Sequence, residues 1–123
     1  MKLTDFQIGD YCLYERTFTI DDFNAFSSSC GDSNPLHWDK EFSLKHDFSA
    51  PIVPVHLSTQ PLSAFAGMVF PGKPSLIHRF DVTSVSPIYY GEELTFSSKI
   101  INLNFEKSFL QFKTIIFNRH LEV

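Results

Sequence analysis

An aspartate and a histidine, joined by a short segment that contains proline, are the residues best placed to do chemistry. The segment reads Gly31-Asp32-Ser33-Asn34-Pro35-Leu36-His37. A carboxylate and an imidazole can move protons when both reach one small volume, and a stiff turn holds them there better than a mobile loop. Pro35 fixes its own φ and pushes Asn34 toward extended geometry, so we expect Asp32 and His37 to converge. The alternative is an ordinary turn, because Asp, Asn, Ser and Pro are the commonest turn residues.

The segments on either side of this turn must position it. Thr19 is a suitable N-cap for a helix, with an acidic residue three positions later, and Gly31 is a typical helix stop. Between them, apolar residues recur at helical spacing and predict one buried stripe, made of Ile20, Phe23, Phe26 and Cys30. A helix therefore leads directly into the turn.

The rest of the chain alternates between strand and helix signals. Residues 11–18 predict a strand, residues 40–47 a short helix or pair of turns, and residues 75–85, 93–104 and 108–118 three further strands. Residues 57–70 are apolar or small almost all round, which is typical of a buried helix. This pattern predicts an α+β fold with a helix packed against a sheet. Apolar residues lie on both faces of the last strand, so a subunit interface is a plausible second cover.

Composition limits the classes of function. The 123 residues fit one domain spanning 1–123, and the net charge of −4 gives no electrostatic reason to expect nucleic acid. Cys12 and Cys30 are too few for a disulfide framework, so we expect two buried thiols in a reducing compartment. There is no signal-peptide pattern and no membrane span. We therefore expect a cytoplasmic protein with no nucleic-acid or membrane partner.

The succession of segments resembles the MaoC-like family, the (R)-specific enoyl-CoA hydratases with a hot-dog fold. The resemblance centres on the Asp-x-Asn-Pro-x-His turn and the helix signature before it, and it continues through four later stretches: Pro51-Ile52-Val53, Pro71-Gly72, Arg79-Phe80-Asp81 and Ser86–Leu94. It covers roughly residues 6–117. It implies a curved antiparallel sheet wrapped around a long central helix, and at least a homodimer, because the chain holds one such unit.

The resemblance also implies an activity. In the family, the Asp and His of the turn hold the catalytic water, so Asp32 and His37 would carry the acid–base work, while Gly31, Asn34 and Pro35 support the turn. The implied reaction is (R)-specific hydration of a trans-2-enoyl thioester, or dehydration of a 3-hydroxyacyl thioester, carried on CoA or on acyl-carrier protein. The chain would then be a hydro-lyase that needs no cofactor.

The start of the predicted central helix departs from the family pattern. A family glycine, whose N–H binds the thioester oxygen, is replaced by Val55 between Pro54 and His56. The Val55 N–H at a helix start could still serve, although its side chain narrows the approach. Pro61 would kink the helix unless the helix begins near residues 58–59. Ser63 lies where some family members place a serine that faces the thioester.

These departures keep two alternatives open. The chain could be a catalytically weak or inactive subunit that binds acyl thioesters, or, less in keeping with the motif, an acyl-CoA thioesterase. The other histidines match no ligand spacing, so we expect no metal site and assign them to the surface or to hydrogen bonds. They are His46, His56, His78 and His120.

Overall fold

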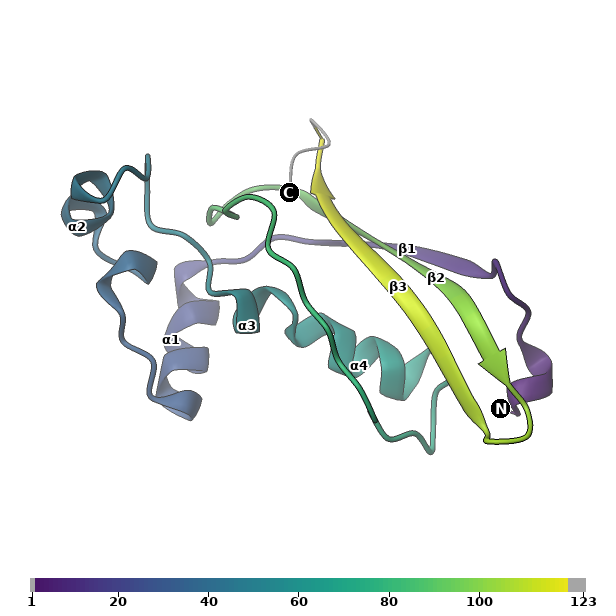
Figure 1. Ribbon diagram of the computed structural model, residues 1–123. Helices are drawn as coiled ribbons and strands as arrows, with labels where there is room; N and C mark the ends of the chain where they lie inside the picture. The colour runs from purple at the N-terminus through teal and green to yellow at the C-terminus, as the bar shows by residue number, and fades with distance from the viewer. Residues whose placement is uncertain (1, 120–123) are drawn as a thin grey trace.

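The computed structural model describes residues 2–119, which form a curved sheet with helices on one side (Figure 1). The sheet is antiparallel, in the order β1 (Tyr11–Arg16), β2 (Leu94–Asn104) and β3 (Phe109–Asn118). Leu94 pairs with Arg16 on one side and with Asn118 on the other. The central strand is therefore the one the sequence predicted with residues 93–104.

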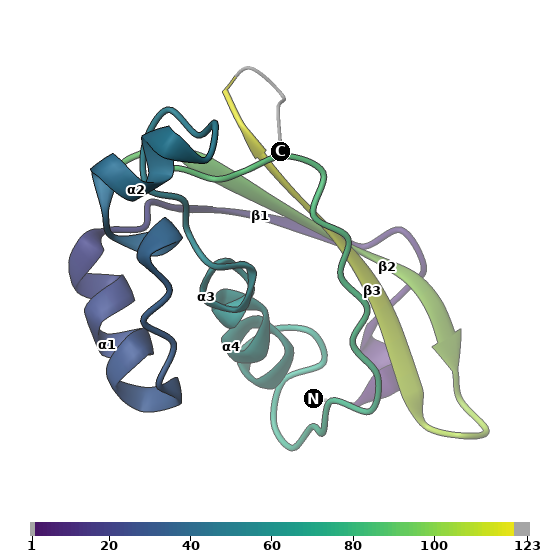
Figure 2. The same ribbon diagram turned by 60° about the vertical axis from the view of Figure 1, so that its left-hand side comes forward.

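The helices occupy the long connection between β1 and β2. In chain order after the short 3₁₀ turn η1 (Leu3–Asp5), they are α1 (Ile20–Cys30), η2 (Pro35–His37), α2 (Lys40–Lys45), α3 (Val55–Ser58) and α4 (Gln60–Met68). Turning the molecule shows α3 and α4 in one line beneath the sheet, with α1 and α2 beyond its end (Figure 2). The predicted α+β architecture is confirmed. No helix within residues 2–119 is long and apolar enough to cross a membrane.

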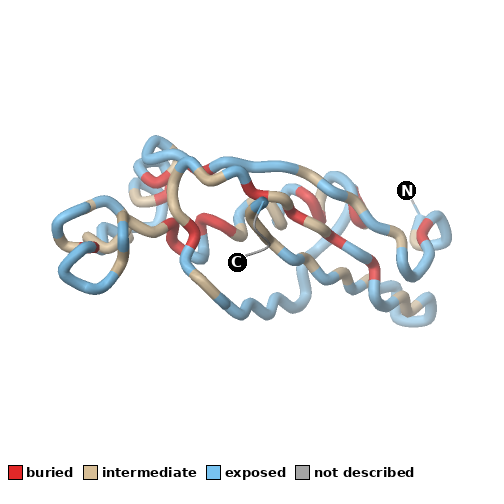
Figure 3. Tube along the Cα trace, turned by 90° about the horizontal axis from the view of Figure 1, so that it is seen from above, coloured by how far each residue is buried: buried red, intermediate tan, exposed pale blue. Residues whose placement is uncertain are grey.

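The core fills the space between the sheet and the helices. One cluster joins the sheet to α1 and α3 and contains Phe18, Phe23, Phe26, Val53, Leu57, Ile88, Leu94 and Phe96. A second cluster lies toward the far end of α4 and contains Phe6, Phe65, Phe70 and Ile100. The Tyr14 ring links them, stacking 5.1 Å from Phe65 and 4.9 Å from Phe96 between ring centroids. Figure 3 shows the buried positions as short red stretches along the middle of the molecule.

Helix α1 begins and ends as predicted. The Thr19 hydroxyl accepts from the Asp22 N–H, the Asp22 carboxylate accepts from the Thr19 N–H, and Gly31 follows the helix with a left-handed φ of 84°. The predicted buried stripe is correct only in its middle, since Phe23 and Phe26 are buried whereas Ile20 and Cys30 are exposed. Spacing identifies a helix face but not how far the rest of the fold covers it.

The predicted central helix is broken in two. Helix α3 ends at Ser58, and α4 starts at Gln60 with Pro61 in its first turn, where the missing N–H costs no helical hydrogen bond. The helix is also not buried all round, because Ser63, Ala64, Met68 and Val69 are exposed. Proline therefore sets the break, and α4 packs on the sheet with one face only.

Two further predictions are wrong. Residues 75–85 form no strand: they run extended beside α4 with exposed side chains and, within the described chain, without backbone pairing. A strand pattern predicts alternating side chains, but it does not show whether a neighbouring strand is available for pairing. The cysteines are free thiols as expected, yet Cys30 is exposed and Cys12 only half-buried, so the expectation of two buried thiols fails.

Candidate active site

The turn after α1 is organised by its own side chains. Gly31 reverses the chain, and its N–H donates to the Ser27 carbonyl at 2.7 Å. Asp32 Oδ1 then accepts from the Asn34 N–H at 2.9 Å, and Asn34 Oδ1 accepts from the Leu36 N–H at 3.1 Å. These contacts cap the short 3₁₀ helix that starts at Pro35 and ends at His37. Both titratable side chains consequently start from a fixed backbone.

The imidazole of His37 has a defined tautomer. Its Nδ1 lies 2.9 Å from the carbonyl oxygen of Ile52, which can only accept, so Nδ1 carries the hydrogen. In the neutral ring, Nε2 then presents a lone pair. The His37 side chain is only 12% exposed, whereas that of Asp32 is 36% exposed. The imidazole is therefore the more buried member of the pair.

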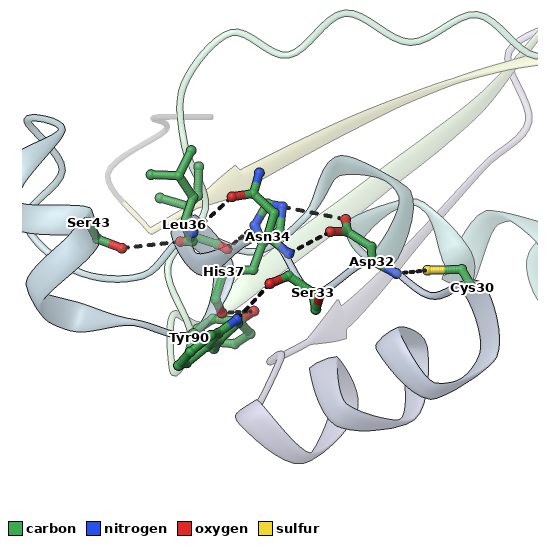
Figure 4. Close-up of polar contacts among 10 residues, drawn as sticks. Cys30, Asp32, Ser33, Asn34, Leu36, His37, Ser43 and Tyr90 are labelled. Atoms are coloured by element: carbon green, nitrogen blue, oxygen red, sulfur yellow. Dashed lines mark hydrogen bonds and ion pairs between the residues drawn. The ribbon is translucent and has the colours of Figure 1, made fainter.

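The two groups face each other at a distance that suits an intervening molecule. His37 Nε2 lies 3.7 Å from Asp32 Oδ2, beyond normal hydrogen-bond length (Figure 4). With Asp32 ionised and His37 neutral, both atoms are acceptors, so neither satisfies the other. A molecule with two O–H or N–H bonds, such as water, can donate to both. The arrangement is chemically suited to hold a water and remove its proton.

Further hydrogen bonds from neighbouring and distant residues hold the turn. The Leu36 carbonyl accepts from the Ile52 N–H at 3.0 Å and from the Ser43 hydroxyl at 3.2 Å. The Tyr90 hydroxyl donates to the His37 carbonyl at 2.8 Å, and Trp38 Nε1 donates to the Ser33 carbonyl at 2.9 Å. Sequence reasoning missed these supports. Those from Ile52 and Tyr90 join segments far apart in the chain, and residue spacing does not encode such contacts.

The start of α3 is the second part of the candidate site. The N–H groups of a first helical turn have no intrahelical acceptor, and among residues 2–119 no group accepts from Val55. Val55 is 39% exposed and lines an open groove of about 430 Å³ with His56, Thr59, Phe80, Val82 and Ser84. Val55 follows Ile52 by three residues, and the Ile52 carbonyl bonds the His37 ring. The start of α3 is thus connected to His37 through Ile52.

Among residues 2–119, no hydrogen bond or ion pair links the other predicted residues, Ser63 and the remaining histidines, to Asp32 or His37. The Ser63 side chain is exposed on α4 and forms no hydrogen bond with the described residues. His46 bonds the Phe42 carbonyl at 2.8 Å, His56 and His78 are exposed, and His120 lies outside the described residues. No group of three or more His, Cys, Asp or Glu side chains within residues 2–119 could hold a metal ion.

The family follows from comparison with known proteins. The model of the MaoC-like domain matches residues 6–102, which is most of the chain and includes the whole turn. The chain belongs to the MaoC-like family. The (R)-specific enoyl-CoA hydratase of Aeromonas caviae is 27% identical over 119 residues, covering 97% of this chain and 89% of that protein. The mitochondrial 3-hydroxyacyl-[acyl-carrier-protein] dehydratase of Arabidopsis thaliana is 28% identical, covering 95% of this chain and 70% of that protein.

Solved structures agree on the architecture of this MaoC-like chain. The A. caviae hydratase superposes with a TM-score of 0.88 at 26% identity, covering 95% of this chain and 89% of that one. An R-hydratase from Pseudomonas aeruginosa gives the same TM-score at 21% identity, covering 98% and 77%. The fold is therefore the expected hot-dog fold. At this level of identity, hydratase or dehydratase chemistry is supported as a class.

Proposed function

We propose that this MaoC-like protein catalyses (R)-specific hydration of trans-2-enoyl thioesters and the reverse dehydration of 3-hydroxyacyl thioesters. The observation that carries the proposal is the pair of facing acceptors, Asp32 Oδ2 and His37 Nε2, 3.7 Å apart with the tautomer of His37 fixed by Ile52. A site of this kind orients a water without needing any other group.

The proposed step uses one water. The water donates one hydrogen to Asp32 Oδ2 and the other to His37 Nε2, which leaves an oxygen lone pair free to attack C3 of the enoyl group. The Asp32–His37 pair takes one proton, so one water O–H bond breaks, and a C3–O bond forms as the C2=C3 π bond opens toward the thioester oxygen. The enolate then collapses and the pair delivers that proton to C2. The overall addition of water is redox-neutral, so it needs no oxidant or reductant.

Negative charge develops on the thioester oxygen during this step and needs a donor. We assign that role to the N–H of Val55, because it lies at a helix start, donates to no described acceptor and opens onto the groove. Ser63, exposed on α4, stays a proposed substrate contact. Asn34, Gly31 and Pro35 act by holding the turn in place.

The proposed assembly is a homodimer or larger homo-oligomer, and the proposed carrier is CoA or acyl-carrier protein. Support for a second copy comes from residues 76–85, which leave several large apolar side chains exposed, namely Leu76, Ile77, Phe80, Val82 and Val85. An exposed apolar run of this kind is commonly covered by a partner.

One observation favours the alternative of a binding subunit with little catalysis. Helix α3 is a single turn that breaks before Pro61, and Val55 stands where the family pattern has glycine. Poor alignment of the Val55 N–H would cost about 10²–10³ in turnover while leaving thioester binding intact.

The deciding experiment follows the absorbance of the conjugated thioester in short and medium trans-2-enoyl-CoA incubated with the protein. A hydratase removes that absorbance, and the product is oxidised by an (R)-specific but not an (S)-specific 3-hydroxyacyl-CoA dehydrogenase. Thermal stabilisation by acyl-CoA without turnover would favour the binding subunit, and release of free thiol would favour a thioesterase.

A further inference from the structure

We propose that Tyr90 is a positioning residue for the acid–base pair and that its hydroxyl, by holding the backbone of His37, sets the rate of the chemical step. This inference rests on the proposed function. Tyr90 contacts no reacting atom in the mechanism above, so it would act only through His37.

Two hydrogen bonds hold His37, one at its carbonyl and one at its ring, and both depend on the segment 88–90. The Tyr90 hydroxyl donates to the His37 carbonyl at 2.8 Å (Figure 4). The residue before it, Tyr89, forms an isolated antiparallel bridge with Ile52, whose carbonyl holds Nδ1 of the His37 ring. The Val53 N–H donates to the Ile88 carbonyl at 2.7 Å, which fixes that bridge. The segment 88–90 therefore holds His37 by its main chain and, through Ile52, by its side chain.

The position of the carbonyl makes the hydroxyl important. His37 is the last residue of η2, and a carbonyl at the end of a helix lacks an intrahelical partner. The Tyr90 ring packs against the buried cluster around Phe18 and Phe96, so the hydroxyl is held in place. Removing it would leave the His37 end of the turn free to move. A displacement of about 1 Å in a reacting group can cost on the order of 100-fold in rate.

The electrostatic environment keeps this donor available. Burial raises the pKa of Tyr90 well above its ordinary value, and the negative charge of Asp32 raises it further. The phenol consequently stays protonated at any pH suited to the assay.

The test compares Tyr90→Phe, which keeps the ring and removes the hydroxyl, with the matched control Tyr11→Phe, at an exposed position of β1. We expect kcat to fall about 10- to 100-fold in Tyr90→Phe with KM changed less than about twofold, and both to stay near wild type in Tyr11→Phe. A ring that only packs would give a wild-type kcat in Tyr90→Phe. That result, or an equal loss in both variants, would overturn the inference.

A second readout separates this inference from the proposed function. In the free protein, the His37 Nδ1 proton bonded to Ile52 should give a slowly exchanging downfield NMR signal, and Tyr90→Phe should speed its exchange at least about tenfold. If the wild-type protein lacks hydratase activity, the proposed function fails, and the exchange rate of this proton still tests whether Tyr90 positions His37. Unchanged exchange in Tyr90→Phe would contradict the positioning role whatever the activity.

Discussion

Two irregular segments of this protein, the turn 31–37 and the extended run 73–87, differ in what holds them. In the turn, the side chains of Asp32 and Asn34 accept backbone N–H groups, and Ile52, Ser43 and Tyr90 reach it from elsewhere in the fold. In residues 73–87 no backbone–backbone hydrogen bond occurs within the described chain. Hydrogen-bonded side chains make a loop a suitable platform for catalysis, whereas an unpaired run with exposed apolar residues suits contact with another chain.

The start of α3 is connected to both segments. Its chain arrives from Ile52 and Val53, which are bonded to the turn and to Ile88. Its exposed side shares a groove with Phe80, Val82 and Ser84 of the extended run. The proposed oxyanion donor, the Val55 N–H, therefore follows a hydrogen-bonded segment and faces a segment without backbone hydrogen bonds.

The largest effect that would sharpen this comparison is expected from Val55→Pro. Pro54 already has an extended backbone (φ −58°, ψ 142°) compatible with a following proline, and proline is well tolerated at the first helical position. The substitution removes the N–H without costing a helical hydrogen bond, so we expect kcat to fall about 10²–10³-fold. Steady-state kinetics beside Val55→Ala, which keeps the N–H, provide the measurement. Equal rates in the two variants would remove Val55 from the mechanism.

The extended run is tested by placing a charge on it. Val85 is 78% exposed in the single chain, so Val85→Asp should change monomer stability by no more than about 0.5 kcal/mol. If a second copy covers this run, the buried charge should weaken the dimer by about 3 kcal/mol, more than 100-fold in its dissociation constant. Light scattering across a dilution series measures this, with Lys107→Asp at the β2–β3 turn as the control. A dimer unaffected by Val85→Asp would place the interface elsewhere.

A smaller effect is expected when the hydroxyls of two half-buried tyrosines, Tyr14 and Tyr90, are removed. The Tyr14 hydroxyl is buried with no hydrogen-bond partner among the described residues, since the nearby Ser98 hydroxyl bonds Thr114 at 2.7 Å instead. Tyr14→Phe should therefore leave the free energy of unfolding unchanged or raise it by about 1 kcal/mol, whereas Tyr90→Phe should lower it by about 1 kcal/mol. Urea denaturation of both variants tests this. Destabilisation by Tyr14→Phe would mean that its hydroxyl has a partner.

The smallest effect is a loss of stability at alkaline pH. Burial raises the pKa of both Tyr14 and Tyr90, so above about pH 10 the unfolded chain loses phenolic protons that the folded chain retains. Unfolding then becomes more favourable as pH rises, and stability present below pH 10 declines above it. Tyr14→Phe and Tyr90→Phe should each flatten this decline in denaturation curves. A decline that is as steep in both variants would assign it to other groups.

Much of the turn 31–37 was predictable because its determinants are local. Gly31 ends the helix, Asn34 and Pro35 shape the bend, and Thr19 with Asp22 caps α1, all by contacts within a few residues. The convergence of Asp32 and His37 follows from these. Their separation of 3.7 Å and the tautomer of His37 do not, because both depend on the distant carbonyl of Ile52.

The failures share a different cause. Residues 75–85 have a strand pattern but pair with no strand among residues 2–119, and Cys30 is exposed although the spacing places it on the buried helix face. Pro61 predicts either a kink or a helix that begins near residues 58–59, and the structure has the later start, with α4 beginning at Gln60. Local sequence specifies conformation, whereas burial and pairing are set by the whole fold.

The measurement that tests the central claim most directly is kcat for trans-2-enoyl-CoA hydration by wild type, Asp32→Asn and His37→Ala, with folding checked by circular dichroism. Asn at position 32 keeps the acceptor that the Asn34 N–H needs, so the turn should persist while the base is lost. We predict a fall of about 10²–10⁴-fold in each variant, and near wild-type turnover in Asp39→Asn, which retains the cap of α2. Wild-type turnover in both Asp32→Asn and His37→Ala would contradict the account.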